Sequence, residues 1–372
     1  MKPFLKSCPF LFIFFIVNCL TLSDADAGFK ITYDDKSLEI YGRIQPRYEW
    51  KEVDNADDEK EHTGHDFYIR RTRIGFKVKY NEEISGKLEY KLDNYLQESK
   101  DPETKLENAY ASFDYFDSRF LVEFGLQNSV FSREGQLSDS KLLFDDRSII
   151  VNKLASEDLA DNATGLHLKG KLVDKHLEYG LGLYEGGDGG GDSSTEGDRS
   201  DSLLYAFGLV YHVFEPESRQ GSHVGDGKTY LTVGAYYTGQ DRKDLEDEET
   251  ISAYGADVFA QFGPATLSAG YFVFEKDFNM AVDRKNDGFY VEGACLIPLS
   301  QWGDLEFAAR YQSYSPDDDF TDPDEKQTSI GVNYYIKKHD VKIQGTYNIN
   351  EKDDNHDYDP GDNLVLQCQL AW

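Results

Sequence analysis

The sequence lacks the long apolar runs that carry helices through membranes. Beyond residue 28, no stretch of about 18 consecutive apolar residues occurs. This excludes a helical membrane anchor in that part of the chain. The mean hydropathy is only −0.61, but a strand of a membrane barrel turns just every second residue toward lipid. Low hydropathy therefore does not exclude a transmembrane β-barrel.

Cysteine is scarce as well. Only Cys295 and Cys368 follow residue 28. We expect them on the lipid side of the twelfth and sixteenth strands, which are not neighbours, so we predict no disulfide and assign neither thiol a role. The motifs C-x-x-C, H-E-x-x-H and G-x-S-x-G are absent too. The sequence therefore predicts no catalytic residues, no metal site, no cofactor and no enzymatic activity.

Basic residues are few: 39 Lys and Arg stand against 69 Asp and Glu, a net charge of −30. Most of this excess is local, because five segments hold 24 of the net negative charges. These segments are 51–65, 185–201, 240–250, 315–325 and 351–362. Such acidic stretches either keep loops solvated or bind divalent cations that bridge to lipopolysaccharide. They also argue against nucleic acid as a partner.

The chain does contain about sixteen short segments with strand periodicity, which follow one another along the sequence. The segments are 38–50, 68–80, 84–95, 105–115, 119–127, 162–172, 176–184, 201–213, 228–238, 252–262, 264–274, 287–297, 303–314, 326–336, 340–350 and 363–372. Tight turns alternate with long, mostly acidic connections between them. This alternation predicts a transmembrane up-and-down antiparallel β-barrel of about sixteen strands, with both termini in the periplasm.

Polar and apolar side chains alternate within these segments. In 68–80, we expect Tyr68, Ile74, Phe76 and Val78 to face lipid. Arg70 breaks this pattern, and we expect its long side chain to reach the lipid headgroups at the strand end. Tyr and Phe make up 49 residues, which fits two aromatic belts at the membrane surfaces.

The N-terminus has the features of a secretory signal peptide. Lys2 and Lys6 precede an apolar run over 10–17, and Ala25-Asp26-Ala27 offers a cleavage site. We expect residues 1–27 to be removed and 28–372 to form one outer-membrane barrel of a Gram-negative bacterium. A lipoprotein anchored at Cys19 is the alternative.

Strand parity directs a set of basic side chains into the lumen. They are Arg43, Arg47, Arg71, Arg73, Lys77, Lys79, Lys87, Lys91, Arg119, Lys169 and Lys171. Such a ladder favours anions in a narrow aqueous pore. The alternative is a merely polar wall in which these residues pair with Glu39, Glu89, Asp93, Asp114 and Glu123.

The connection 127–161 is the longest, and its apolar content is unusual for a solvated loop. It includes Phe131, Leu142, Leu143 and Phe144. This predicts a third loop that folds into the barrel and narrows it. The basic residues expected at the narrowest point are Arg133, Lys141, Arg147 and Lys153.

Several stretches resemble the phosphate-selective porin O/P family. They are Arg70-Arg71-Thr72-Arg73-Ile74-Gly75-Phe76-Lys77-Val78-Lys79, Lys87-Leu88-Glu89-Tyr90, Glu107-Asn108-Ala109-Tyr110-Ala111-Ser112-Phe113-Asp114-Tyr115, Val122-Glu123-Phe124-Gly125 and, in the long loop, Phe131-Ser132, Glu134, Leu137-Ser138, Phe144 and Arg147-Ser148. The resemblance implies a sixteen-stranded barrel, a homotrimer and a basic, anion-preferring pore.

The sequence thus favours an outer-membrane porin that passes small anions, phosphate among them, or other small hydrophilic solutes. Its partners would be outer-membrane lipid, lipopolysaccharide and small inorganic anions. Two further classes stay open. One is a plugged structural or adhesive barrel with cation-binding loops, and the other is a secreted soluble β-protein.

Overall fold

In the computed structural model, the described residues are 28–53, 62–97, 102–187, 202–216, 221, 228–242, 249–278, 283–317, 324–351 and 360–372. The expected signal peptide, 1–27, lies outside them, as do most of the acidic segments. No helix in the described ranges is long and apolar enough to cross a membrane.

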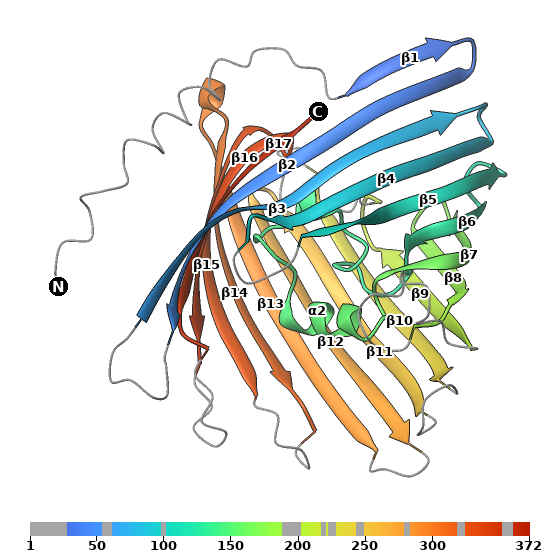
Figure 1. The fold of residues 1–372 in the computed structure, drawn as a ribbon. Coiled ribbons are helices and arrows are strands. Elements are labelled where there is room, and N and C mark those ends of the chain that lie inside the picture. The colour runs from blue at the N-terminus through green and yellow to red at the C-terminus, as the bar shows by residue number, and fades with distance from the viewer. Residues whose placement is uncertain are drawn as a thin grey trace.

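Sixteen of the strands formed by the described residues close into one antiparallel barrel (Figure 1). They are β2 (Lys36–Val53), β3 (His62–Lys79), β4 (Ile84–Tyr95), β5 (Glu103–Tyr115), β6 (Phe120–Asn128), β7 (Asn162–Leu172), β8 (Leu177–Glu185), β9 (Leu203–His212), β10 (Tyr230–Arg242), β11 (Glu249–Phe262), β12 (Ala265–Phe278), β13 (Arg284–Pro298), β14 (Asp304–Ser315), β15 (Glu325–Lys337), β16 (Val341–Asn350) and β17 (Asn363–Ala371). Each pairs with its sequence neighbours, and β17 pairs with β2 to close the ring. The predicted architecture and strand count are confirmed.

One strand was not predicted. β1 (Phe29–Tyr33) pairs with the first residues of β2, from Phe29 opposite Ile40 to Tyr33 opposite Lys36. β17 pairs with the rest of the same edge, and its last partner is Arg43. β1 therefore continues the edge of β2 beyond the point where the barrel seam ends.

Connections differ between the two ends of the barrel, as the sequence predicts. At one end the turns are short: Gly263 and Pro264 alone separate β11 from β12. Two other turns there reverse through three consecutive residues with positive φ, Phe116–Ser118 and Val173–Lys175. The C-terminus lies at this end. The connection from β9 to β10 is longer and only partly within the described residues.

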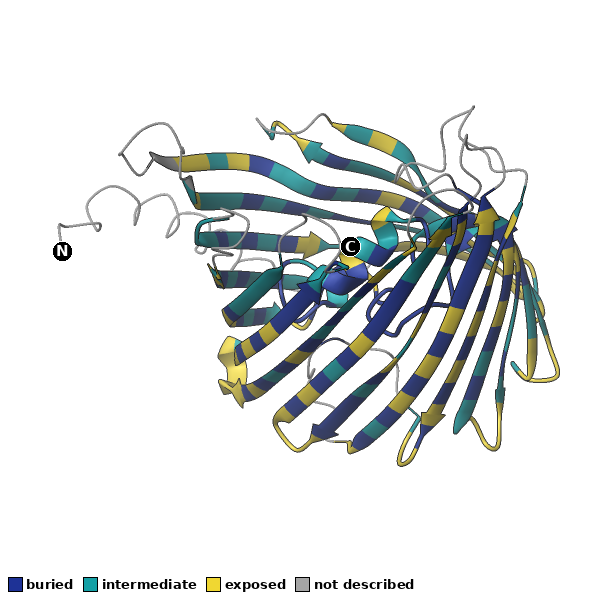
Figure 2. Ribbon diagram, turned by 90° about the horizontal axis from the view of Figure 1, so that it is seen from below, coloured by how far each residue is buried: buried dark blue, intermediate teal, exposed yellow. Residues whose placement is uncertain are grey.

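Exposure alternates along the strands, most regularly in the second half of the barrel (Figure 2). In β9, Tyr205, Phe207 and Leu209 are exposed, whereas Ala206 and Val210 are buried. Period-two alternation turns one face of every strand outward. The outward face is rich in large apolar side chains, as a lipid-facing barrel surface requires. Cys295 and Cys368 lie on this face, as expected, and neither forms a disulfide within the described ranges.

The seam between β17 and β2 depends on a glycine. The N–H and C=O groups of Gly42 and Trp372 pair at 2.9 Å in both directions. The Trp372 ring lies against Gly42, so that a Cβ added there would stand 2.5 Å from Cζ2 and 2.9 Å from the carbonyl oxygen of Arg73. Only glycine leaves room for this ring.

Gly42→Ala should therefore destabilise the barrel. Overpacking of this kind costs roughly 1–3 kcal/mol, and thermal unfolding of the folded protein in detergent measures the loss. Gly293→Ala is the matched control, because its Cβ would meet nothing closer than 3.4 Å. Equal unfolding temperatures for the two variants would contradict this role of the Trp372 ring.

Candidate functional site: the barrel lumen and its long loop

The connection between β6 and β7, here named the long loop (129–161), contacts much of the inner wall. It contains η1 (Asp139–Lys141) and α2 (Ile149–Ser156), and α2 lies within the ring of strands in Figure 1. Apolar loop residues form one cluster with the wall of β8–β14. It includes Val130, Phe131, Ile150, Val151 and Leu154 of the loop and Tyr184, Leu204, Tyr236, Phe272 and Tyr314 of the strands.

Polar contacts fix the rest of the loop. Its backbone carbonyls accept hydrogen bonds from side chains of β15 and β16: Asn333 donates to Leu143, and Lys342 donates to Leu142. Gln369 of β17 donates to Ser140. Lys342 is fully buried beneath the loop. Backbone groups that would be unsatisfied inside a barrel thus find partners on the wall.

The predicted arginines lie under this loop. The side chains of Arg43, Arg47, Arg71 and Arg73 are 10%, 4%, 5% and 4% exposed. Their guanidinium groups form ion pairs with carboxylates of the loop. Arg73 also forms ion pairs with Asp93 and Glu107 of the wall.

Asp139 of η1 is a buried carboxylate among four arginines. Its oxygens lie 2.5 Å from Nη1 of Arg147, 3.1 Å from Nη2 of Arg43, 3.2 Å from Nε of Arg71 and 3.7 Å from Nη2 of Arg73. Burial alone raises the pKa of the Asp139 carboxyl, but the surrounding guanidinium groups hold that pKa well below its usual range.

Asp146 forms a second centre. Its carboxylate accepts from Arg47 at 2.8 Å, from Arg71 at 2.6 Å and from Arg70 at 3.2 Å. Burial again raises the pKa of Asp146, and these three guanidinium groups lower it well below the usual range. The backbone carbonyl of Asp145 accepts from both Arg47 and Arg71. Carboxylates and carbonyls therefore anchor the loop together.

The positions of Arg70 and Tyr68 contradict the prediction that Tyr68 faces lipid and that Arg70 reaches the lipid headgroups. Neither faces lipid: Arg70 reaches Asp146, and the Tyr68 hydroxyl donates to Glu49 at 2.9 Å inside the barrel. The cause is a β-bulge, because Gln45 pairs with Arg71 while the next residue, Pro46, pairs with Ile69. The extra residue, Arg70, shifts strand parity for everything before it.

A second bulge brings another residue into the lumen that parity alone does not predict. Glu89 pairs with Asn108, but Tyr90 pairs with Leu106. The extra residue is Glu107, which forms ion pairs with Arg73 at 3.3 Å and Lys91 at 3.6 Å. The bulge thus adds a carboxylate to the basic wall.

The predicted lysines also form ion pairs, but most of them remain accessible. The pairs are Lys77 with Glu39, Lys79 with Glu82, Lys87 with Glu89, Lys91 with Glu103 and Glu107, Lys169 with Glu123, and Lys171 with Glu178. In the pair of Lys169 and Glu123, the side chains are 40% and 7% exposed, and in that of Lys171 and Glu178 they are 41% and 10% exposed. The ammonium groups face open space while these carboxylates lie against the wall.

Other predicted residues have different surroundings. Arg133 is buried, with its guanidinium 3.9 Å from the Phe259 ring centre and its backbone N–H bonded to Asp257. It anchors the loop rather than facing open space. Lys153 pairs with Glu325 at 2.6 Å. Arg119 is exposed in the turn between β5 and β6.

Open space remains on the side of β4–β8. A cavity of about 260 Å³ separates the loop from β4–β7. It is lined by four basic and four acidic side chains, Arg43, Lys87, Arg147 and Lys169 with Glu89, Glu107, Glu123 and Asp139. A second cavity, of about 360 Å³, lies beside β5–β10, and a third, of about 510 Å³, beside β1–β6. Neighbouring cavities share lining residues, among them Lys169 and Glu123.

A closed sixteen-stranded barrel with a charged, cavity-lined interior defines the class of outer-membrane porins. The sequence model of the family "phosphate-selective porin O and P" matches residues 38–372. The chain belongs to this family, and the predicted family is confirmed. It is an outer-membrane protein that forms a channel for small anions or other small hydrophilic solutes.

Solved structures share the fold at low sequence identity. OmpF of Salmonella typhi in complex with daunomycin is 15% identical with a TM-score of 0.64, covering 92% of this chain and 100% of that one. The anion-selective porin of Comamonas acidovorans is 14% identical with a TM-score of 0.60, covering 91% and 100%. A loop deletion mutant of OmpT from Vibrio cholerae is 12% identical with a TM-score of 0.59 and the same coverage. No curated protein matches the chain.

The depressed pKa values predict how the loop responds to acid. A carboxyl whose pKa is lowered on folding contributes stability that is present above its unfolded pKa, about 4, and is lost as pH falls through the lower folded value. Protection of the backbone amides of residues 139–156 against hydrogen exchange, relative to their intrinsic exchange rates at each pH, should therefore stay high from neutral pH to about pH 4 and fall only below it. Loss of protection already between pH 7 and 5 would contradict the roles of Asp139 and Asp146.

Proposed function

We propose that the permeation route is off-centre, between the long loop and the inner wall of β4–β8, and that its lysines give it a moderate preference for anions. The arginines of β2 and β3 have a different role, because they hold the loop. Three contiguous cavities support this route. The loop packs against β8–β17 and against β2 and β3. The open space therefore lies mainly between the loop and β4–β8.

The observation that carries the anion preference is the unequal exposure within the ion pairs. The wall is nearly balanced in formal charge, but Lys87, Lys169 and Lys171 reach water more than their partner carboxylates do. At these three pairs, a passing ion therefore meets the ammonium group first. Such groups in a narrow, water-filled channel raise the local anion concentration.

The same contacts argue for a general anion preference rather than a dedicated phosphate site. Arg47 and Arg71 already donate to Asp146 and to the Asp145 carbonyl. Arg43 already donates to Asp139. Guanidinium groups bound to carboxylates are not available as forks for phosphate oxygens. The lysines act as point charges and discriminate less among anions.

The membrane arrangement is part of the proposal. The tight turns and both ends of the barrel domain would face the periplasm, and the acidic connections would face outward, toward lipopolysaccharide. Outer-membrane porins keep short turns on the periplasmic side. One solved structure with this fold, an OmpT of Vibrio cholerae, is described as a trimer form, and we propose a homotrimer here.

The decisive experiment is conductance of the refolded mature chain in planar bilayers under a potassium chloride gradient. The proposal expects stepwise currents, a reversal potential whose sign indicates anion selectivity, and only weak block of the current by added phosphate. Block at low phosphate concentration would favour a dedicated phosphate site. Folded protein that passes no current would favour the plugged structural barrel.

Replacing Lys87 and Lys169 together by Gln should shift the reversal potential in the direction of lower anion selectivity. The substitution removes two exposed ammonium groups and leaves Glu89 and Glu123 charged. Lys338→Gln, in the exposed turn between β15 and β16, removes one charge away from the route and serves as control. The proposal fails if the control shifts the potential as much as the double variant does.

A further inference from the structure

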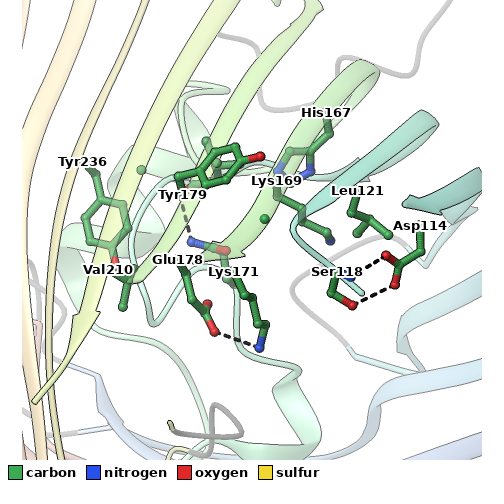
Figure 3. Close-up of a pocket in the computed structure, with 15 residues that line it drawn as sticks. Asp114, Ser118, Leu121, His167, Lys169, Lys171, Glu178, Tyr179, Val210 and Tyr236 are labelled. Atoms are coloured by element: carbon green, nitrogen blue, oxygen red, sulfur yellow. Dashed lines mark hydrogen bonds and ion pairs between the residues drawn. The ribbon is translucent and has the colours of Figure 1, made fainter. Parts of the chain in front are cut away.

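The second cavity has a chemical character unlike the rest of the lumen. Its floor is apolar: Val130 of the long loop, Val210 of β9 and Tyr236 of β10 are buried there, and Leu121 of β6 forms part of the side. Figure 3 shows Val210 and Tyr236 on one side of the cavity and Leu121 on the other. Water against such a surface is readily displaced by an apolar group.

Two glycines create this floor. Gly180 of β8 pairs with Gly208 of β9. In both glycines, the position that a Cβ would occupy faces the long loop. A Cβ at Gly180 would stand 2.8 Å from Cγ1 of Val130, and a Cβ at Gly208 would stand 2.9 Å from the Val130 carbonyl oxygen. The loop backbone therefore approaches the wall closely here, and Val130 completes the apolar surface.

The rim of the same cavity carries two lysines and two carboxylates, the latter being Asp114 and Glu178. Lys169 and Lys171 line it, with side chains 40% and 41% exposed. In Figure 3 they lie between the apolar residues of the two sides, and Lys171 reaches Glu178. Each ammonium has three donors, and its one ion pair, 2.8 Å long in both cases, leaves donors for a second acceptor.

We propose that this cavity is a binding site for small organic carboxylates with an apolar or aromatic body. The carboxylate would bind at Lys171 and Lys169, and the body would lie over Val130, Val210 and Tyr236. A volume of about 360 Å³ is within the range of small-molecule sites. The inference deepens the proposed function, because it names a class of solute for which the route has a specific site.

The test measures binding directly, so it does not depend on conductance. Fluorine NMR titrations of the folded, full-length mature chain in detergent would use 4-fluorobenzoate as probe. Neutral 4-fluorobenzamide lacks the charge, and fluoroacetate lacks the ring. The proposal expects 4-fluorobenzoate to bind at least about tenfold more tightly than either, which corresponds to about 1.4 kcal/mol.

Two substitutions test the two halves of the site. Lys171→Gln should reduce the advantage of the benzoate over the benzamide at least about threefold, and Val210→Thr should reduce its advantage over fluoroacetate similarly. Val365→Thr is the matched control, because Val365 is equally buried on β17 but outside this cavity. Leu121→Gln replaces Val210→Thr if that variant does not fold.

The outcomes are separable. Equal affinity for all three probes in the folded wild-type chain would overturn the inference, even if the channel conducts anions as proposed. So would an unchanged preference in both Lys171→Gln and Val210→Thr. A chain that passes no current but binds 4-fluorobenzoate selectively would overturn the proposed function and leave this site in place.

Discussion

The ion pairs between the long loop and the arginines of β2 and β3 determine the shape of the lumen. Asp139 and Asp146 together form ion pairs with six arginines, five of the wall and Arg147 of the loop itself. Buried charges of this kind are tolerable only when they are paired. Because these contacts and the apolar cluster with β8–β14 lie on different parts of the wall, the loop has one position, and the open space is centred on β4–β8.

This arrangement separates two tasks that the sequence assigns to one basic ladder. Arginine suits the fixed contacts, since its planar fork binds carboxylates and carbonyls at several points. Lysine suits the open wall, where a flexible stem brings a hydrated charge to the water. Lys169 and Glu123 illustrate the result: the pair is neutral, yet the ammonium is the accessible member. Exposure, and not formal charge alone, then decides what a passing ion meets.

Much of the fold was predictable from the sequence because the alternation of polar and apolar residues along a barrel strand indicates which side chains face outward. The alternation in β9 and the short turn at Gly263 and Pro264 are local signals. The bulge at Arg70 was not predictable in the same way, since a single extra residue reverses parity without changing composition. Pro46, which lacks an N–H for the ladder, sits opposite that bulge and was the available clue.

The partners of the lumen residues were harder to predict. Pairs within one strand, such as Lys87 with Glu89 in β4, follow from alternation, and pairs on adjacent strands, such as Lys169 of β7 with Glu123 of β6, follow from register. Both kinds were weighed as an alternative. The pairs that wall arginines form with Asp139 and Asp146 join residues roughly 65 to 100 positions apart. They depend on the path of the loop, which strand periodicity does not describe. Arg133 was expected at a constriction for the same reason, and its contact with Phe259 is visible only in three dimensions.

The central claim is that solutes pass on one side of the loop only. Its most direct measurement is the reaction of a charged methanethiosulfonate with single cysteines during current recording, in a background lacking Cys295 and Cys368. Lys169→Cys faces the open side, whereas Gln344→Cys replaces a side chain that is buried beneath Leu142 and Leu143 of the loop. The account predicts a rapid, stepwise change in current for the first and none for the second. Equally fast modification of Gln344→Cys would contradict it.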